Sequence, residues 1–202
     1  MTILNDNNAI LRIFQEANAI RYGHFVLSSG LHSNIYIQCA KLFESPKIGI
    51  KICSLLVKKI KQKVNDSINV ILTPAIGGIV LGYEIGRQLG IRTIFCERVN
   101  GVFKLRRDFQ ILQCDNILLI EDVITTGKSS LEAVQCIEGM GGKIITVASL
   151  IKRNDNIQLP FPIISLIEIN IKNYSEENLT EELKQLPINT PGSRKYLTQN
   201  SI

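Results

Sequence analysis

Two adjacent carboxylates, Glu121 and Asp122, follow an apolar run at 117–120 and precede a short loop of small hydroxyl residues. Burying either carboxylate without a partner would be costly, so the pair should face water, a cation or a ligand. The loop at 125–129 lies between a predicted strand and a predicted helix, where free backbone N–H groups and the helix dipole favour an anion. This combination predicts a pocket for a phosphorylated sugar.

The loop that follows the two acids supplies hydrogen-bond donors. Four of its residues carry hydroxyl groups: Thr125, Thr126, Ser129 and Ser130. Gly127 would let the backbone approach a phosphate closely. The alternative from these residues alone is a pair of solvated acids followed by ordinary helix-capping hydroxyls. A P-loop for a nucleoside triphosphate does not fit, because that motif needs glycine where Asp122 stands.

Three further stretches could serve an anionic ligand. The stretch 73–78 opens a predicted helix with Gly77 and Gly78, so its backbone N–H groups could face a phosphate. Arg153 follows the strand predicted at 143–151 and could bind a carboxylate through its planar guanidinium. The stretch 97–110 places four cations around an Asn-Gly turn: Arg98, Lys104, Arg106 and Arg107. The alternatives are a packed turn, a surface arginine and a solvated hairpin.

The elements that must position these residues alternate along the chain. Apolar runs predict buried strands at 69–73, 91–99, 116–120, 143–151 and 162–169, with two short strands within 24–38. Helical periodicity predicts helices at 8–20, 47–63, 77–90 and 129–140, and an acidic helix at 175–186 capped by Ser175. Strands alternating with helices indicate an α/β fold with a parallel sheet flanked by helices. In such sheets ligands bind beyond the carboxyl ends of the strands, where Glu121 and Asp122 are expected.

Length and composition exclude several classes. The 202 residues suit one domain, and the composition, 45% hydrophobic and 20% charged, is ordinary for a globular protein. The net charge of +5 suits an anionic partner, but no basic run favours nucleic acid, and no apolar stretch is long enough for a membrane span. Five scattered cysteines and only two histidines argue against a zinc site. The N-terminal sequence shows no signal-peptide pattern, so a cytoplasmic protein is expected.

The stretch LLIEDVITTGKSS at 118–130 closely resembles the phosphoribosyl diphosphate signature of the type I phosphoribosyltransferases. Other stretches narrow the resemblance to the orotate phosphoribosyltransferases. HFVLSSGLHSNIYIQ at 24–38 is similar to their N-terminal hood, TPAIGGIVLG at 73–82 to their diphosphate loop, and ERVNGVFKLRRDFQI at 97–111 to their mobile catalytic loop in one bacterial branch. SLIKRNDN at 149–156 resembles the strand end with their base-binding arginine, and TPGSR at 190–194 recurs in that branch.

The resemblance implies one phosphoribosyltransferase domain over 1–202, with residues 1–45 forming a small N-terminal hood. It implies transfer of ribose 5-phosphate from 5-phospho-α-D-ribose 1-diphosphate to orotate, giving orotidine 5'-monophosphate and diphosphate in pyrimidine biosynthesis. It also implies Mg²⁺ held mainly by the substrate, with contact to the protein through Glu121 or Asp122 and no residue assigned as a direct ligand. A homodimer is expected, in which the lid at 97–110 serves the neighbouring subunit.

The resemblance further implies a role for each site residue. The residues expected to bind the donor are Glu121, Asp122, Val123, Ile124, Thr125, Thr126, Gly127, Lys128 and Ser129. The diphosphate loop is Ala75, Ile76, Gly77 and Gly78, with a non-proline cis peptide bond at Ala75–Ile76. Thr125 and Arg153 are expected to bind orotate. Lys104 and Arg106 of the lid, together with Asp122, are expected to act in catalysis.

The lid departs from the better-known branch of the family, in which this loop pairs a lysine with a histidine. No histidine is present at 97–110, and arginine is a poor proton donor, so a general-acid role for the lid is in doubt. Serine stands at Ser28 and glycine at Gly77, where lysine is common. The rival functions are transfer to another base and a regulator that senses the phosphoribosyl donor while binding nucleic acid.

Overall fold

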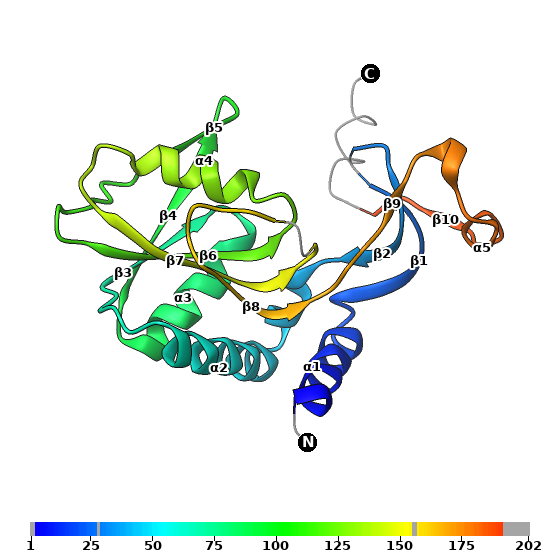
Figure 1. Cartoon of the computed structure of the whole chain (residues 1–202), viewed down its shortest axis with the longest axis horizontal. Helices are drawn as coiled ribbons and strands as arrows, with labels where there is room; N and C mark the ends of the chain where they lie inside the picture. Colours follow the sequence, from blue (N-terminus) through cyan, green and yellow to red (C-terminus); the bar gives the residue numbers. More distant parts are fainter. Residues whose placement is uncertain (1–2, 28, 155–156, 192–202) are drawn as a thin grey trace.

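The main body of the molecule is a six-stranded sheet with helices on both faces (Figure 1). The structure is a computed structural model that describes residues 3–27, 29–154 and 157–191. The strands lie in the order β5-β4-β3-β6-β7-β8. Their bounds are β3 Val70–Pro74, β4 Arg92–Val99, β5 Val102–Leu105, β6 Asn116–Ile124, β7 Lys143–Lys152 and β8 Ile163–Glu168. All neighbouring strands are parallel except β5, which runs antiparallel to β4, so the predicted fold class is confirmed.

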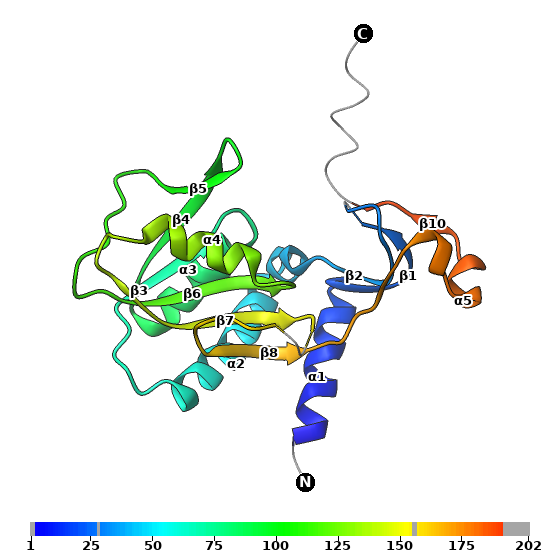
Figure 2. The ribbon, with the colours of Figure 1, turned by 45° about the horizontal axis from the view of Figure 1, so that its top comes forward.

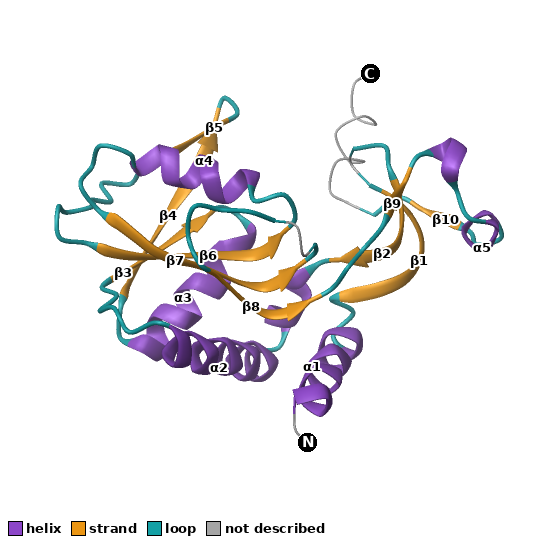
Figure 3. Cartoon of the chain, in the orientation of Figure 1, coloured by secondary structure: helices purple, strands orange, loops and turns teal. Residues whose placement is uncertain are grey.

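The helices bury the two faces of this sheet in separate clusters. Their bounds are α1 Ile3–Glu16, α2 Pro46–Lys63, α3 Gly77–Leu89 and α4 Lys128–Ile137. Helices α2 and α3 cover one face, and α4 covers the other (Figure 3). Because β6 is buried from both sides, its side chains alternate between the two clusters: Leu118 and Ile120 face α2 and α3, whereas Ile117 and Leu119 face α4.

A row of glycines brings α3 close to the sheet. A Cβ atom at Gly78 would lie 3.0 Å from Thr73 Cβ, and one at Gly82 would lie 2.1 Å from Thr73 Cγ2. One at Gly86 would lie 2.1 Å from Thr93 Oγ1. The spacing of four residues puts these glycines on one helix face. The start of α3 is therefore held directly behind the end of β3, where the predicted diphosphate loop lies.

We expect Gly82→Ala to destabilise the protein, although alanine is usually the better helix former. The new methyl group would overlap Thr73 Cγ2, and overpacking of a close contact costs about 1–3 kcal/mol. Urea unfolding of the wild type and the variant measures the change. Thr73→Ser removes Cγ2 and keeps the hydroxyl, so the double variant should recover most of the loss. A Gly82→Ala protein as stable as the wild type would contradict this account of the packing.

A second sheet of four short strands stands apart from the main sheet (Figures 1 and 2). Its order is β10-β1-β2-β9. The bounds are β1 Ile20–Val26, β2 His32–Ile37, β9 Asn173–Tyr174 and β10 Ile188–Asn189. Two chain segments join the sheets, one from β2 toward β3 and one from β8 to β9. We call the second sheet the hood. The predicted hood segment at 1–45 contributes β1 and β2, and the C-terminal part of the chain contributes the other two strands.

Two histidines pair inside the hood. His24 on β1 and His32 on β2 are buried, with 2.6 Å between His24 Nε2 and His32 Nδ1. Since one of these nitrogens must donate and the other accept, the pair joins the two strands by a side-chain hydrogen bond.

Two predicted element boundaries were wrong, those of the first helix and of strand β6. The first helix ends at Glu16, since Asn18 takes a left-handed φ of 54° and Ile20 begins β1. Strand β6 continues to Ile124. Glu121 and Asp122 therefore lie within the C-terminal part of the strand and not after it. The strand is longer because β7 pairs with it as far as Ile124.

The predicted helix at 175–186 was also wrong in extent. The chain forms a single 3-10 turn at Glu176–Asn178 and a four-residue helix, α5, at Glu181–Lys184. Thr180 rather than Ser175 caps α5, because Thr180 Oγ1 accepts a hydrogen bond of 3.3 Å from the Leu183 N–H. An extended Thr180 interrupts the helical pattern.

None of the helices in the described part of the chain combines the length and apolar character that a membrane crossing needs. Ser28, the last two residues of SLIKRNDN and the last three of TPGSR lie outside the described residues.

Candidate active site

The two carboxylates predicted to bind a ligand lie side by side near the end of β6. Glu121 is only 7% exposed, and its Oε1 accepts a hydrogen bond from the hydroxyl of Ser130 on α4. Asp122 points to the opposite face of the strand, where a Cβ atom at Gly77 would lie 2.6 Å from Asp122 Oδ2. Gly77 therefore makes room for the Asp122 carboxylate at the start of α3. The acid pair thus links β6 to the first turns of both α3 and α4.

Burial controls the charge of these two acids. It raises the pKa of Glu121 to about 7, with a smaller upward contribution from Asp122, while the Ser130 hydroxyl opposes the shift. Burial also raises the pKa of Asp122, against the backbone N–H of Val123, which donates to Asp122 Oδ1 at 2.9 Å. A carboxyl group that titrates near neutrality is a common feature of functional sites.

The predicted phosphate loop turns sharply from β6 into α4. Gly127 has a left-handed φ of 78° and immediately precedes the helix. Thr126 Oγ1 accepts a hydrogen bond of 3.3 Å from the Lys128 N–H, and the Gly127 carbonyl accepts one of 3.0 Å from the Leu131 N–H. Backbone N–H groups in the first turn of α4 remain for an anion. Thr125, Thr126 and Lys128 have exposed side chains at the same place.

Three details of this loop differ from the prediction. Ser130 is buried and donates to Glu121, so its hydroxyl serves the acid rather than a phosphate. A Cβ atom at Gly127 would lie 2.7 Å from Leu159 Cδ2, which means that Gly127 packs against the loop after β7. The Ile124 side chain lies in the α4-side core, so only its backbone can contact a ligand.

The predicted diphosphate loop joins β3 to α3. The Ala75–Ile76 peptide bond is cis, which confirms the prediction. The Ala75 N–H donates a hydrogen bond of 2.7 Å to the Cys96 carbonyl on β4, and the Ile76 side chain is 87% exposed. Gly77 faces Asp122, whereas Gly78 faces Thr73 and the Ile120 carbonyl. The loop is thus fixed between β4 and the acid pair.

The predicted lid is the β4–β5 hairpin with the turn that follows it, and it projects from the body of the molecule beside α4 (Figures 1 and 2). Its turn residues, Asn100 and Gly101, both have positive φ, at 51° and 83°, as a type I' turn requires. Arg98 is held in place: it pairs with Glu132 of α4, donates to the Gly101 carbonyl at 2.6 Å and stacks on Phe103 at 4.1 Å.

The other lid cations are arranged around one acid. Arg106 Nη1 lies 3.6 Å and Arg107 Nη2 3.3 Å from the Glu97 carboxylate. Lys104 is exposed and lies directly opposite Glu97 in the strand pairing. A competing anion could therefore draw Arg106 and Arg107 away from a single carboxylate, with Lys104 nearby.

A cavity of about 480 Å³ joins the diphosphate loop to the lid. The residues that line it are Ala75, Ile76, Ile79, Phe95, Glu97, Arg98 and Arg107. Lys104 and Arg106, the two lid residues predicted to be catalytic, do not line it. The structure thus brings two of the four lid cations next to the predicted diphosphate loop.

Arg153 lies at the end of β7, next to the end of β6. Its backbone N–H donates a hydrogen bond of 2.9 Å to the Ile124 carbonyl. Its Nη2 donates to Asn173 Oδ1 of the hood at 3.1 Å, while its Nε is buried without a hydrogen-bond partner among the described residues. Burial lowers the pKa of the guanidinium, which an anionic ligand would offset.

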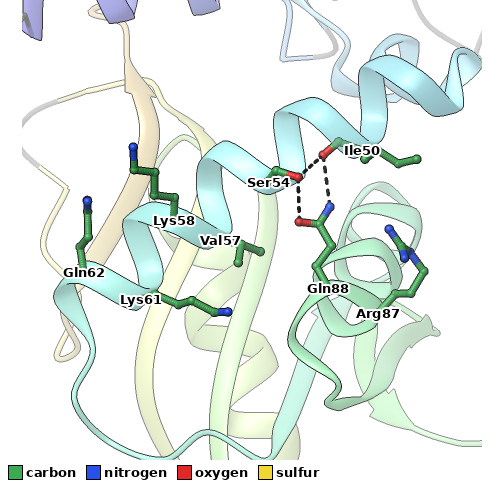
Figure 4. Close-up of a pocket in the computed structure, with 8 residues that line it drawn as sticks. All are labelled: Ile50, Ser54, Val57, Lys58, Lys61, Gln62, Arg87 and Gln88. Carbon is green, nitrogen blue, oxygen red and sulfur yellow. Dashed lines mark hydrogen bonds between the residues drawn. The ribbon is translucent and has the colours of Figure 1, made fainter.

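A groove of comparable size, about 560 Å³, lies between α2 and α3, away from these residues (Figure 4). Several of its polar groups lie within hydrogen-bonding distance of one another: the Ser54 hydroxyl lies 2.8 Å from Ile50 O and 3.0 Å from Gln88 Oε1 and can donate to one of them at a time, and Gln88 Nε2 donates to Ile50 O at 3.2 Å. Arg87 makes a bidentate pair with Glu84. Since these groups satisfy one another, the carboxyl edge of the sheet is the better candidate site.

The sequence interpretation missed three partners. Glu97 and Glu132 hold the lid arginines, and Asn173 holds Arg153. The pattern that could have identified Glu97 is its position in the hairpin, directly across from Lys104. No local pattern marks Asn173, because its contact depends on how the hood meets the main sheet.

Comparison with known proteins gives a consistent result. Residues 38–182 match the family described as "Phosphoribosyl transferase domain". An orotate phosphoribosyltransferase from Caldanaerobacter subterraneus subsp. tengcongensis is 40% identical over 191 residues, covering 94% of this chain and 99% of that protein. One from Rhizorhabdus wittichii is 41% identical, covering 92% and 95%. The crystal structure of orotate phosphoribosyltransferase from Aeropyrum pernix superposes with a TM-score of 0.69 at 19% identity, covering 79% of this chain and 93% of that one.

Proposed function

The chain belongs to the phosphoribosyltransferase family, as one of its orotate phosphoribosyltransferases, and from this premise we propose how its residues carry out the reaction. The enzyme transfers ribose 5-phosphate from 5-phospho-α-D-ribose 1-diphosphate to N1 of orotate, in pyrimidine biosynthesis. The observation that best supports the assignment of the site is the convergence at one sheet edge of the acid pair of β6, the first turn of α4 and Arg153, which follows β7.

The donor takes the edge formed by β6 and α4. Glu121 and Asp122 accept hydrogen bonds from the ribose hydroxyls, and the loop at 123–129 binds the 5'-phosphate through N–H groups at the start of α4. Thr125 contacts both the donor and the base. Held in this way, the ribose presents its anomeric carbon toward the base, which reduces the entropic part of the barrier.

The leaving diphosphate takes the space between the loop at 75–78 and the lid. Bond breaking builds positive charge on the ribose ring and negative charge on the diphosphate, so fixed cations at the diphosphate stabilise the transition state. Arg107 and Arg98 lie beside this loop, and Lys104 and Arg106 join them when the lid closes. Closure also excludes water, which would otherwise hydrolyse the donor.

Magnesium fits this site. It prefers oxygen ligands and retains water, and Glu121 and Asp122 offer carboxylate oxygens beside the ribose position. Among the described residues, no group of three or more His, Cys, Asp and Glu side chains gathers closely enough to hold a metal. The remaining ligands would then come from the donor and from water. When bound, the ion neutralises charge on the diphosphate.

A homodimer with a shared lid remains the expected assembly. In support, α3 and the loop before it expose an apolar stripe: Ile76 is 87%, Val80 54% and Tyr83 66% exposed. These residues follow helical spacing and begin at the diphosphate loop. A second copy placed on this stripe would bring its own hairpin near the first copy's site. The cytoplasmic location also remains a prediction.

The pH dependence of kcat/KM for the donor should reflect the titration of Glu121. Because the pKa of Glu121 is raised to about 7, the carboxyl takes up a proton as the pH falls through that value and loses acceptor capacity for the ribose hydroxyls. We expect kcat/KM for the donor to fall below pH 7. Glu121→Gln should remove this limb of the profile and leave only the titration of the donor's own phosphates. An unchanged profile in Glu121→Gln would contradict the assignment.

The same raised pKa affects stability in the opposite direction. The folded state holds this proton more tightly than the unfolded state, whose carboxyl titrates near about 4.3. The contribution of Glu121 to stability is therefore fully present below about 4.3 and is lost as the pH rises toward 7.

The decisive test is release of diphosphate from the donor, measured with orotate, uracil, adenine or no base, each with and without magnesium. We expect release with orotate and magnesium and little with the other bases. A preference for a purine would reject the assigned substrate and favour the alternative of transfer to another base. Donor binding without release, coupled to a salt-sensitive shift on nucleic acid, would favour the regulator.

A further inference from the structure

We propose that Asn173 is a positioning residue for base recognition, which orients the Arg153 guanidinium through a neutral amide oxygen and so leaves its charge for the carboxylate of the base. This inference rests on the proposed function, because it requires a base that carries a carboxylate. It concerns a residue of the hood, outside every stretch that the donor and the diphosphate contact.

The backbone around Arg153 is held on both sides. Its N–H donates to the Ile124 carbonyl at 2.9 Å, and its carbonyl accepts a hydrogen bond of 3.3 Å from the Ile171 N–H. The base of the side chain is therefore fixed between β6 and the segment that leads into β9. Its long flexible stem, however, leaves the guanidinium plane free to rotate unless another group restrains it.

Asn173 supplies that restraint. Its Oδ1 accepts a hydrogen bond of 3.1 Å from Arg153 Nη2. The two-residue strand β9 fixes Asn173 in turn, because Asn173 pairs with the buried Ser33 of β2. The guanidinium is thus tied to the hood through one of its two terminal nitrogens.

The Nε donor of Arg153 is buried and is not used within the described part of the chain. A guanidinium binds a carboxylate through two parallel N–H groups, and a buried unpaired Nε–H is costly until such a partner arrives. Because Asn173 holds Arg153 Nη2, the guanidinium plane has a fixed orientation, and the same N–H groups always face the base.

The neutrality of Asn173 matters as much as its geometry. Within 3–27, 29–154 and 157–191, no carboxylate forms an ion pair with Arg153. An aspartate at 173 would accept the same hydrogen bond, but it would neutralise the guanidinium and repel the carboxylate of an incoming base. Like charges brought together across a binding site weaken binding.

The test compares Asn173→Asp, Asn173→Ala and the wild type in steady-state kinetics, with orotate and the donor varied separately. Asn173→Ala frees the guanidinium without adding charge, so KM for orotate should rise by about two- to tenfold, the loss of one hydrogen bond. Asn173→Asp should raise it further, by more than about tenfold. Both variants should keep KM for the donor near the wild-type value. Uracil lacks the carboxylate, so kcat/KM for uracil should be the same in Asn173→Asp as in the wild type. The ratio of kcat/KM for orotate to that for uracil should therefore decrease.

Asn189→Asp is the matched control, since it adds the same charge to β10 of the same sheet, at an exposed position whose side-chain amide donates a hydrogen bond of 3.0 Å to the Pro187 carbonyl. It should leave KM for orotate unchanged. Thermal unfolding of all variants checks that the hood is intact. Because Asn173 is exposed, only small changes in the unfolding temperature are expected.

Four outcomes would overturn the inference. Equal increases of KM for orotate in Asn173→Asp and Asn173→Ala would show that the charge at this position has no role. Parallel losses of kcat/KM for orotate, uracil and the donor would indicate general damage to the hood. Wild-type behaviour of both variants, in an enzyme that uses orotate, would reject the inference and leave the proposed function standing. A wild-type protein that does not use orotate would overturn both.

Discussion

Arg153→Ala is expected to lower kcat/KM for orotate by on the order of 10²–10³-fold. Removing one partner of a desolvated, hydrogen-bonded charge pair costs about 2–5 kcal/mol, and each 1.4 kcal/mol is about tenfold. The effect should appear in KM for orotate, because the guanidinium binds the carboxylate in the ground state as well as in the transition state. KM for the donor should change little, since the proposed donor site lies at β6 and α4. Steady-state kinetics with each substrate varied in turn separate the two.

Two variants serve as controls for Arg153→Ala. Arg153→Lys keeps the charge but loses the planar fork, so it should recover only part of the activity. Arg12→Ala removes an exposed arginine of α1 that lies far from the site in the sequence and should behave like the wild type. Orotate kinetics that survive Arg153→Ala unchanged would show that another group recognises the base.

Mixing two inactive variants should restore activity to roughly a quarter of the wild-type value. Asp122→Asn should disable the proposed ribose site, and Lys104→Ala combined with Arg106→Ala should disable the proposed lid. Each protein alone should be nearly inactive. If the lid serves the neighbouring subunit, each mixed dimer has one site with both defects and one with neither. About half of the dimers are mixed after random exchange, which gives the quarter.

The same experiment distinguishes a lid that serves its own subunit. Every site in the mixture would then retain one defect, and no activity would return. Native mass spectrometry must confirm that subunits have exchanged, and the wild type mixed with either variant provides the scale. Mixtures that stay inactive after confirmed exchange would rule out the shared lid and leave the enzymatic assignment unaffected.

Much of the main sheet could be predicted because its signals are local. Buried parallel strands are apolar on both faces, so the runs at 69–73 and 143–151 are recognisable without tertiary information. The acid pair of β6 and the glycine before α4 were likewise identified from neighbouring residues. The fold class followed from the alternation of predicted strands and helices, and the cis bond at Ala75–Ile76 from the family resemblance; both are confirmed.

The remaining features depend on contacts between distant segments. Strands β9 and β10 have two residues each, too few to show any period, and they exist only because β1 and β2 offer open edges. The Ser130 hydroxyl could as well have capped a helix or bound a phosphate; burial against Glu121 decides its role. Arg98 could not be separated from the other lid cations, because its partner, Glu132, lies on α4.

The composition of the hood from both ends of the chain affects the order in which the site can form during synthesis. Strands β1 and β2 leave the ribosome first, whereas β9 and β10 follow only after the whole main sheet has been made. Pairings between such distant residues form slowly, since a long loop must close before any contact stabilises it. The acid pair and the phosphate loop should therefore form early during synthesis. Arg153 should gain its hydrogen bond to Asn173 only after the hood is complete. The nascent protein would then be able to bind the donor before it could select orotate over other bases.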